Sequence, residues 1–243
     1  MISKCIFSGN IADDTGGGVT NQSSATPSFL NCVFANNTAV NGGGVYSSSA
    51  TVSITNCTIY GNAASSQGGG IRINSNTTTV KNCIIWGNTS ASGASILNSG
   101  TTNVTYSIVQ GTLYAGTGNK NLDPLFINAS NLKGADNIWA TVDDGLMIKC
   151  SSPARNAGNG ATPTSDIVGT TRVNGIDMGA YEQTDIAVIP DLSIAITTGS
   201  QNTCAGSSVT FTASPTNGGS SPTYQWQLNG NNVGSGNTTY TNT

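Results

Sequence analysis

The chain has 243 residues, of which 36% are hydrophobic and 8% charged, and its formal net charge is −3. Disordered chains combine low hydrophobicity with high net charge, so this composition excludes them. The few Lys and Arg residues are scattered, which argues against binding to nucleic-acid phosphates. No apolar run approaches the ~20 residues of a membrane-spanning helix. The absence of histidine excludes Ser-His-Asp and Cys-His catalysis and histidine-ligated metals.

A repeat of about 26 residues occupies residues 1–122. Four copies begin at a cysteine, at intervals of 27, 25 and 26 residues, and a degenerate fifth copy begins at Ser107, 24 residues after the last cysteine. A period of 20–50 residues indicates a solenoid or a repeat array. The copies begin with Cys5–Asn10, Cys32–Asn37, Cys57–Asn62 and Cys83–Asn88, and glycine triplets follow the first three at residues 16–18, 42–44 and 68–70.

The apolar pattern within one copy predicts the type of solenoid. Ile54 and Cys57 fall on opposite parities, which implies a corner near Asn56, and a further apolar pair follows the glycines at Ile71 and Ile73. Each copy is therefore expected to form three short strands with corners between them. The sequence predicts an all-β fold, a parallel β-helix of about five coils, roughly 24 Å long.

Equivalent residues of stacked coils should form columns. We expect the cysteines to be small, buried, reduced thiols, because closely paired zinc ligands are absent and parallel stacking suits a disulfide poorly. Asparagines at corners tolerate left-handed backbone and can bond the next coil. The glycine triplets are expected to be tight corners, because none has the Lys-Ser/Thr of a phosphate-binding loop. The predicted inward columns are Cys5, Cys32, Cys57 and Cys83; Phe7, Phe34, Ile59, Ile85 and Val109; and Ile2, Phe29, Ile54, Val80 and Val104. The predicted corner columns are Asn10, Asn37, Asn62 and Asn88, and Asn31, Asn56 and Asn82. The predicted outward column is Ile6, Val33, Thr58, Ile84 and Ile108.

The repeat carries a family resemblance. The motif Phe-x-x-Asn at residues 7–10 and 34–37, followed by a Gly-Gly-rich aliphatic segment such as residues 43–46, resembles the repeats of polymorphic outer-membrane proteins. Similar repeats occur in large surface proteins of Bacteroidetes-type bacteria. The third and fourth copies depart from the motif, with Ile59 and Ile85 in place of Phe. The resemblance covers roughly the first 112 residues and implies a right-handed parallel β-helix in a surface or adhesin setting.

Residues 123–183, the closing segment, break the repeat. Their motifs resemble the "choice-of-anchor" segment that ends β-helices in secreted bacterial proteins, which implies a closing region ahead of a sorting or anchoring module. We expect the segment to cover the open strand edges of the last coil. Arg172, Asp177 and Glu182 are its expected polar ties, and Cys150 is expected to be buried within it. The motifs are Asp123–Phe126, Asp144–Ile148, Ser152–Gly158, Asp166–Arg172 and Ile176–Glu182.

A second module follows a predicted linker at residues 184–191. Cys204–Ala213 alternates with period two, and Tyr224–Gly230 carries a central Trp226. These segments resemble the first strands of an immunoglobulin-like sandwich, and the resemblance implies a partner cysteine beyond Thr243. We therefore expect residues 192–243 to be a partial immunoglobulin-like module that is loosely folded.

Few residues are candidates for a site, and we assign no catalytic, cofactor-binding or metal-binding residue. The pairs Asp13-Asp14 and Asp143-Asp144 can bind Ca²⁺, although solvated loop carboxylates are the favoured interpretation, and Asp144 can instead belong to the closing segment. Tyr60 and Trp86 occupy the same outward position on neighbouring coils. Such a pair can stack on sugar rings, although packing against a neighbour is the more common role.

The function expected from these features is a non-enzymatic secreted or cell-surface β-helix, adhesin-like or a display and spacer module. Its expected partners are polysaccharides or host and cell-surface glycans, without nucleic acid or cofactor, and it is expected to be a monomer. Because residues 1–5 lack a signal-peptide core, an export signal is expected upstream. The alternative is a polysaccharide lyase or glycoside hydrolase whose catalytic coils lie elsewhere. No acidic residue lies between Asp14 and Asp123, which argues against hydrolysis on the middle coils.

Overall fold

The computed structural model describes residues 1–74, 77–111, 113–160, 163–173, 175–184, 191–202, 204–216 and 222–242. Within these residues the chain is all β and contains no helix. It divides into two compact units, Met1–Asp185 and Ile186–Thr243. The predicted linker at residues 184–191 lies outside the described residues, apart from its two ends.

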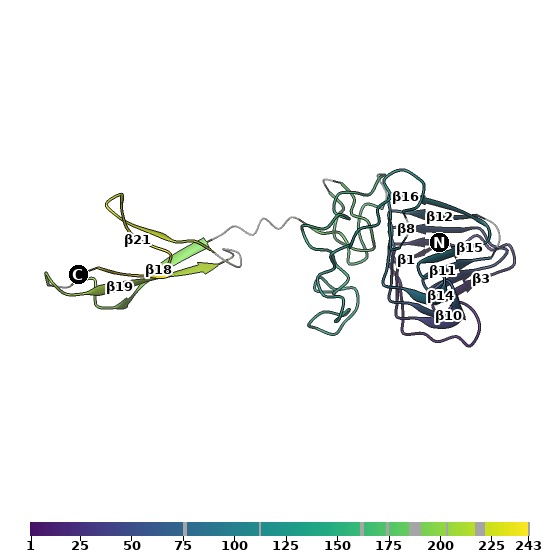
Figure 1. The fold of residues 1–243 in the computed structure, drawn as a ribbon, viewed down its shortest axis with the longest axis horizontal. Helices are drawn as coiled ribbons and strands as arrows, with labels where there is room; N and C mark the ends of the chain where they lie inside the picture. Colours follow the sequence, from purple (N-terminus) through teal and green to yellow (C-terminus); the bar gives the residue numbers. More distant parts are fainter. Residues whose placement is uncertain are drawn as a thin grey trace. The chain divides into compact units, whose positions relative to one another are not determined.

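The first unit is a β-solenoid of short parallel strands stacked in four sheets (Figure 1). The first sheet contains β1 (Ile2–Ser3), β4 (Ser28–Leu30), β8 (Val52–Thr55), β12 (Thr77–Lys81) and β16 (Thr101–Thr105). The second contains β2 (Ile6–Ser8), β5 (Val33–Ala35), β9 (Thr58–Tyr60), β13 (Ile84–Trp86) and β17 (Ile108–Val109). The third contains β6 (Thr38–Asn41), β10 (Ala63–Gln67) and β14 (Thr89–Ser92). The fourth contains β3 (Val19–Asn21), β7 (Val45–Ser47), β11 (Ile71–Ile73) and β15 (Ile96–Asn98).

The coils differ from the prediction in two ways, in the number of strands in each coil and in the number of coils. Each middle coil has four strands, whereas the apolar pattern predicted three. The additional strand is the one in the third sheet, for example β10, whose sequence Ala-Ala-Ser-Ser-Gln lacks apolar alternation. The solenoid makes about four turns and not five, because its last turn is incomplete and, among the described residues, contains only β16 and β17.

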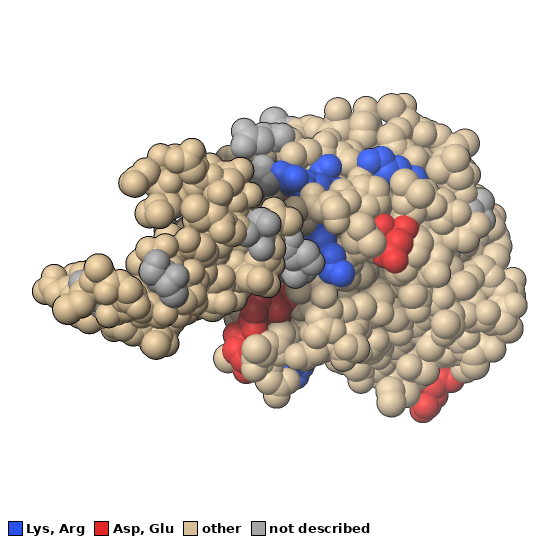
Figure 2. Space-filling view, turned by 60° about the vertical axis from the view of Figure 1, so that its left-hand side comes forward, with Lys and Arg blue, Asp and Glu red and all other residues tan. Residues whose placement is uncertain are grey.

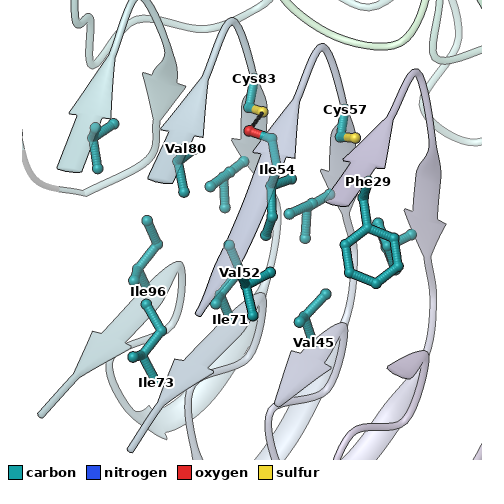
Figure 3. Close-up of a cluster of buried hydrophobic side chains, with 14 of the residues drawn as sticks. Phe29, Val45, Val52, Ile54, Cys57, Ile71, Ile73, Val80, Cys83 and Ile96 are labelled. Atoms are coloured by element: carbon teal, nitrogen blue, oxygen red, sulfur yellow. Dashed lines mark hydrogen bonds between the residues drawn. The ribbon is translucent and has the colours of Figure 1, made fainter. Parts of the chain in front are cut away.

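The inside of the coils forms one continuous core. Four members of the predicted inward column are confirmed: Phe29, Ile54, Val80 and Val104 are in register on successive strands and are at most 2% exposed. Ile2 is in register with Phe29 but is 36% exposed, because β1 is the edge strand of the first sheet. Figure 3 shows side chains of this column lying close to those of the fourth sheet, such as Ile71. Dispersion contacts and removal of apolar surface from water therefore hold the coils together along the whole stack.

The cysteine column is also confirmed. All of its members are free thiols; Cys32, Cys57 and Cys83 are buried, and Cys5 in the first coil is half-buried. Each thiol donates a hydrogen bond to the carbonyl oxygen two residues earlier, at 3.1–3.4 Å. The Cys83 sulfur also contacts the carbonyl oxygen of Ile54 (Figure 3). These bonds satisfy the polar character of the thiols inside an apolar core.

A ladder of asparagine amides joins the coils at one corner. The side-chain oxygen of Asn62 accepts the backbone and side-chain N–H groups of Asn37, both at 2.9 Å, and Asn88 accepts those of Asn62 in the same way. Left-handed backbone was expected at these asparagines and is instead found one residue earlier, at Gly61 and Gly87. The glycine makes the turn, which leaves the asparagine amide directed along the stack.

The glycine triplets make tight corners, as predicted. A side-chain carbon built on Gly43 would clash with the carbonyl oxygens of Ala63 and Gly69 in the next coil. Any larger residue would push neighbouring coils apart at this corner.

The open end of the last coil is covered by residues 113–121. The Tyr114 ring packs against the core, and its hydroxyl donates to the carbonyl of Ile96 at 3.3 Å. The Asn119 side chain donates to the carbonyl of Val104 at 2.8 Å. The closing segment was expected to cover this end, and that prediction is wrong. The short cap already covers the end, and the closing segment lies beside the coils (Figure 1).

The second unit contains two small antiparallel sheets. One is formed by β18 (Asp191–Thr198), β19 (Val209–Thr216) and β22 (Thr239–Asn242), and the other by β20 (Gln225–Leu228) and β21 (Asn231–Ser235). The rings of Trp226 and Tyr240 stack at 5.9 Å between centroids. Of the described hydrophobic residues in this unit, only Ala213 is buried. The unit therefore has very little core of its own.

Candidate functional site

The outer face of the second sheet is buried, in contrast to the prediction. The predicted outward column is Ile6, Val33, Thr58, Ile84 and Ile108. The last four are at most 1% exposed, and Ile6 in the first coil is half-buried. They face outward from the coil as the alternation predicted, but the closing segment packs over them through residues such as Met178. The Thr58 hydroxyl accepts the backbone N–H of Ala180 at 3.0 Å. The apolar character of this column was the signal of a covering segment.

A row of three buried asparagines binds the closing segment. Asn31, Asn56 and Asn82 have left-handed backbone, with φ between 49° and 53°. Asn82 accepts the backbone N–H of Asn159 at 2.9 Å and donates to its carbonyl at 3.0 Å. Asn31 accepts a bond from Arg172 at 3.1 Å. This row was expected to be a ladder between coils. One such bond exists, from Asn82 to Asn56 at 3.3 Å, and the other bonds described here tie the closing segment to the solenoid.

The predicted polar ties of the closing segment are confirmed. Arg172 and Glu182 form a buried ion pair at 2.8 Å, with side chains 1% exposed. The Asp177 carboxylate accepts the backbone N–H groups of Asn156 at 2.7 Å and Gln183 at 2.6 Å. Burial raises the pKa of Asp177 and Glu182 and lowers the pKa of Arg172, because the charged forms lose solvation. These charges hold the segment together and are not open to a ligand.

Asp144 also belongs to the interior of the closing segment. Its carboxylate accepts the hydroxyl of Tyr181 at 2.5 Å and the N–H of Ala140 at 2.8 Å, and burial raises its pKa. Asp13 and Asp14 are exposed. In the described part of the chain, no group of three or more His, Cys, Asp and Glu residues could hold a metal ion.

Cys150 is exposed, although it was predicted to be buried in the closing segment. It lies in the turn after Ile148, which is 2% exposed and takes the buried position. Its sulfur lies 3.5 Å from the side-chain nitrogen of Gln183.

A cleft of about 230 Å³ lies where the closing segment meets the second sheet. Tyr60 and Trp86 pair in register on β9 and β13 and line one side of the cleft. Both were predicted to face outward, and both are half-buried. The closing segment lines the other side with Asp123, Leu125, Phe126, Ala129 and Lys149. Phe126 packs edge-on against Tyr60, with ring centroids 5.4 Å apart. The structure therefore shows one ring of the predicted pair packing on a neighbour, and both rings border the cleft.

The second unit has a larger hollow of about 300 Å³. It is lined mainly by apolar and aromatic residues of the two small sheets, including Phe211, Trp226 and Tyr240. The cleft of the first unit differs because it has charged groups of both signs at its edge.

Charge is sparse over the surface. Figure 2 shows one face on which Lys, Arg, Asp and Glu form small separate groups among uncharged residues. No helix long and apolar enough to cross a membrane occurs among the described residues.

Comparisons with known proteins identify the solenoid. Residues 1–124 match the family described as the right handed beta helix region. No curated protein and no solved structure matches the chain. The match spans just over half of the chain and coincides with the stacked parallel strands, so the chain belongs to the right-handed β-helix family.

Proposed function

We propose that the chain is a non-enzymatic, secreted or cell-surface β-helix module that binds polysaccharide on a side face. The observation that carries this proposal is the aromatic-lined cleft between the second sheet and the closing segment. The stacked coils provide a rigid wall, because each coil is bonded to the next through its strands and its asparagine ladder. A rigid wall holds a weakly binding cleft in one shape without further ordering cost.

The chemistry of the carboxylates supports binding over hydrolysis. Glycoside hydrolysis needs two carboxyl groups facing each other across the scissile bond. In the closing segment, the buried carboxylates of Asp144, Asp177 and Glu182 accept bonds from backbone N–H groups, Tyr181 or Arg172. The coils between Asp14 and Asp123 carry no acid.

The finer family assignments belong to this proposal. The repeat resembles those of polymorphic outer-membrane proteins, and the closing segment resembles a choice-of-anchor segment. The second unit, with Trp226 between two antiparallel sheets, resembles part of an immunoglobulin-like sandwich. These resemblances support an extracellular or outer-membrane location.

A glycan array with the full chain, followed by a product assay on every hit, tests the proposal. We expect binding to one or more polysaccharides, with no new reducing ends and no unsaturated products. Release of products would instead support the alternative, a polysaccharide lyase or glycoside hydrolase. The absence of any glycan hit would refute the binding function.

A further inference from the structure

We propose that the cleft beside Tyr60 and Trp86 is a binding site for a short stretch of neutral, hydroxyl-rich polysaccharide, with Trp86 as the stacking platform and Asp123 and Lys149 as hydrogen-bonding groups. This inference rests on the proposed function and specifies its site and ligand class.

The aromatic wall of the cleft is built into the sheet. Tyr60 and Trp86 are register partners on neighbouring parallel strands, so their backbones are about 4.8 Å apart. The edge-on contact with Phe126 holds Tyr60 in place. Trp86 is half-buried, and its indole N–H has no hydrogen-bond partner among the described residues. An aromatic ring with a free polar tip suits a contact that is apolar on one side and hydrated on the other. A sugar ring offers such a contact, because its face can be apolar while its hydroxyl groups remain hydrated.

The opposite wall is held in an unusual backbone conformation. Leu125 has a left-handed backbone, with φ of 52°, which is uncommon for a residue other than glycine. Its N–H donates to the Asp123 carboxylate at 2.8 Å, and its carbonyl accepts the N–H of Lys149 at 2.9 Å. These bonds place Asp123 and Lys149 at the cleft, and both residues are exposed.

The polar groups of the cleft favour a neutral ligand. One carboxylate and one ammonium line it, so their charges cancel and neither sign is attracted strongly. The Asp123 carboxylate uses one oxygen for Leu125 and, among the described residues, has no partner for the other. A carboxylate oxygen accepts from sugar hydroxyls and an ammonium donates to them. The volume of about 230 Å³ lies below the ~300–1,000 Å³ of drug-sized pockets, which suits one or two sugar rings and weak binding.

The test is a titration of the full chain with hexasaccharides, followed by NMR of the Trp86 indole N–H. The probes are hexasaccharides of glucose, mannose, galactose and xylose, together with galacturonate and mannuronate hexamers. We expect a neutral hexasaccharide to shift the Trp86 indole signal and to lose affinity about tenfold in Trp86→Ala, because the stacking surface is removed. Asp123→Asn should weaken binding by a smaller factor while leaving the indole environment of the free protein unchanged.

The control is Tyr46→Ala, which removes another half-buried aromatic ring, on β7 in the fourth sheet. It should leave affinity unchanged, and circular dichroism should show that all variants remain folded. Equal affinity for Trp86→Ala and the wild type would overturn the cleft assignment but leave glycan binding elsewhere on the protein intact. Preference for the uronate hexamers would overturn the neutral ligand class. No binding to any probe, together with an empty glycan array, would overturn the proposed function itself.

Discussion

At the scale of single residues, Thr58 and Ile59 show what alternation along a strand can and cannot predict. The pattern correctly places Ile59 inside the coil and Thr58 on its outer face. It cannot predict what packs on the outer face, because that depends on a segment about 120 residues away in the chain. Both side chains are therefore buried, and substitution at either should destabilise the protein.

Ile59→Ala should lower the free energy of unfolding by about 2–5 kcal/mol, because it leaves a cavity in the core. Thr58→Ala should cost about 1–3 kcal/mol, because the buried N–H of Ala180 loses its acceptor. Urea denaturation of the first unit measures both. The control Ser65→Ala, at an exposed position on β10, should change stability by less than about 0.5 kcal/mol. A cost for Thr58→Ala as small as that of the control would show that the closing segment does not cover this face in solution.

The cysteines differ sharply in accessibility. Cys150 and Cys204 are exposed and should react at once with a thiol reagent in the native protein. Cys57 is fully buried, and burial raises its pKa well above the usual thiol value, so the reactive thiolate is scarce as well as inaccessible. We expect all six cysteines to react after denaturation. Fast native labelling of Cys57, or a disulfide within the column, would contradict the column.

At the scale of elements, the repeat period predicted the stacking of the coils and their inward columns, but the apolar pattern did not predict the strands of the third sheet. Strand β10 consists of small and polar residues, so no apolar alternation marks it. The sequence predicted only one wall of the cleft. Tyr60 and Trp86 stood out because they share a position in neighbouring repeats, whereas Asp123 and Lys149 reach the cleft through the irregular path of the closing segment, which follows no period.

The closing segment should depend on its buried ion pair. Arg172→Leu leaves the Glu182 carboxylate buried without its cation, and loss of one partner of a buried pair typically costs about 3–5 kcal/mol. Hydrogen exchange should accelerate at the amides of Gly179 and Ala180, which bond to the solenoid. Lys133→Leu is the control, because Lys133 has no ion pair among the described residues. Unchanged exchange at these two amides in Arg172→Leu would show that docking does not need the pair.

Mild acid should stabilise the first unit. Burial raises the pKa of Asp144, Asp177 and Glu182, so the folded state binds these protons more tightly than the unfolded state. Their stabilising contribution is complete below the unfolded carboxyl pKa near 4 and is lost as pH rises through the higher folded values. The urea midpoint should therefore be higher at about pH 5 than at about pH 7. Asp144→Asn should reduce the difference between the two urea midpoints. A lower midpoint at pH 5 than at pH 7 would contradict the raised pKa of these carboxyl groups.

At the scale of the whole molecule, the two units differ in how much core they have. The first buries continuous apolar columns, whereas the second leaves Leu192, Ile194 and Leu228 about half exposed. Limited proteolysis should cut between Thr184 and Asp191 and then digest the C-terminal unit, leaving a stable fragment of about residues 1–184, because so little burial cannot offset the ordering entropy. Slow amide exchange across β19 and β20 would show instead that the second unit is stable.

The hydrogen bonds between the closing segment and the solenoid have a mechanical consequence. A solenoid under tension can lose coils one at a time from a free end, because each coil contacts only its neighbours. Here Arg172 holds Asn31, Ala180 holds Thr58 and Asn159 holds Asn82, so one segment is bonded to three successive coils. The first coil is held less firmly, by one exposed hydrogen bond from the Lys4 ammonium to the Ser165 hydroxyl at 3.1 Å and by the partly buried Ile6. When the chain is pulled from Met1 in single-molecule force spectroscopy, the first coil should therefore peel at lower force, and the next three should rupture together in one larger step. The closing segment would thus make three coils resist shear as one unit, whereas coils without it would unfold one at a time.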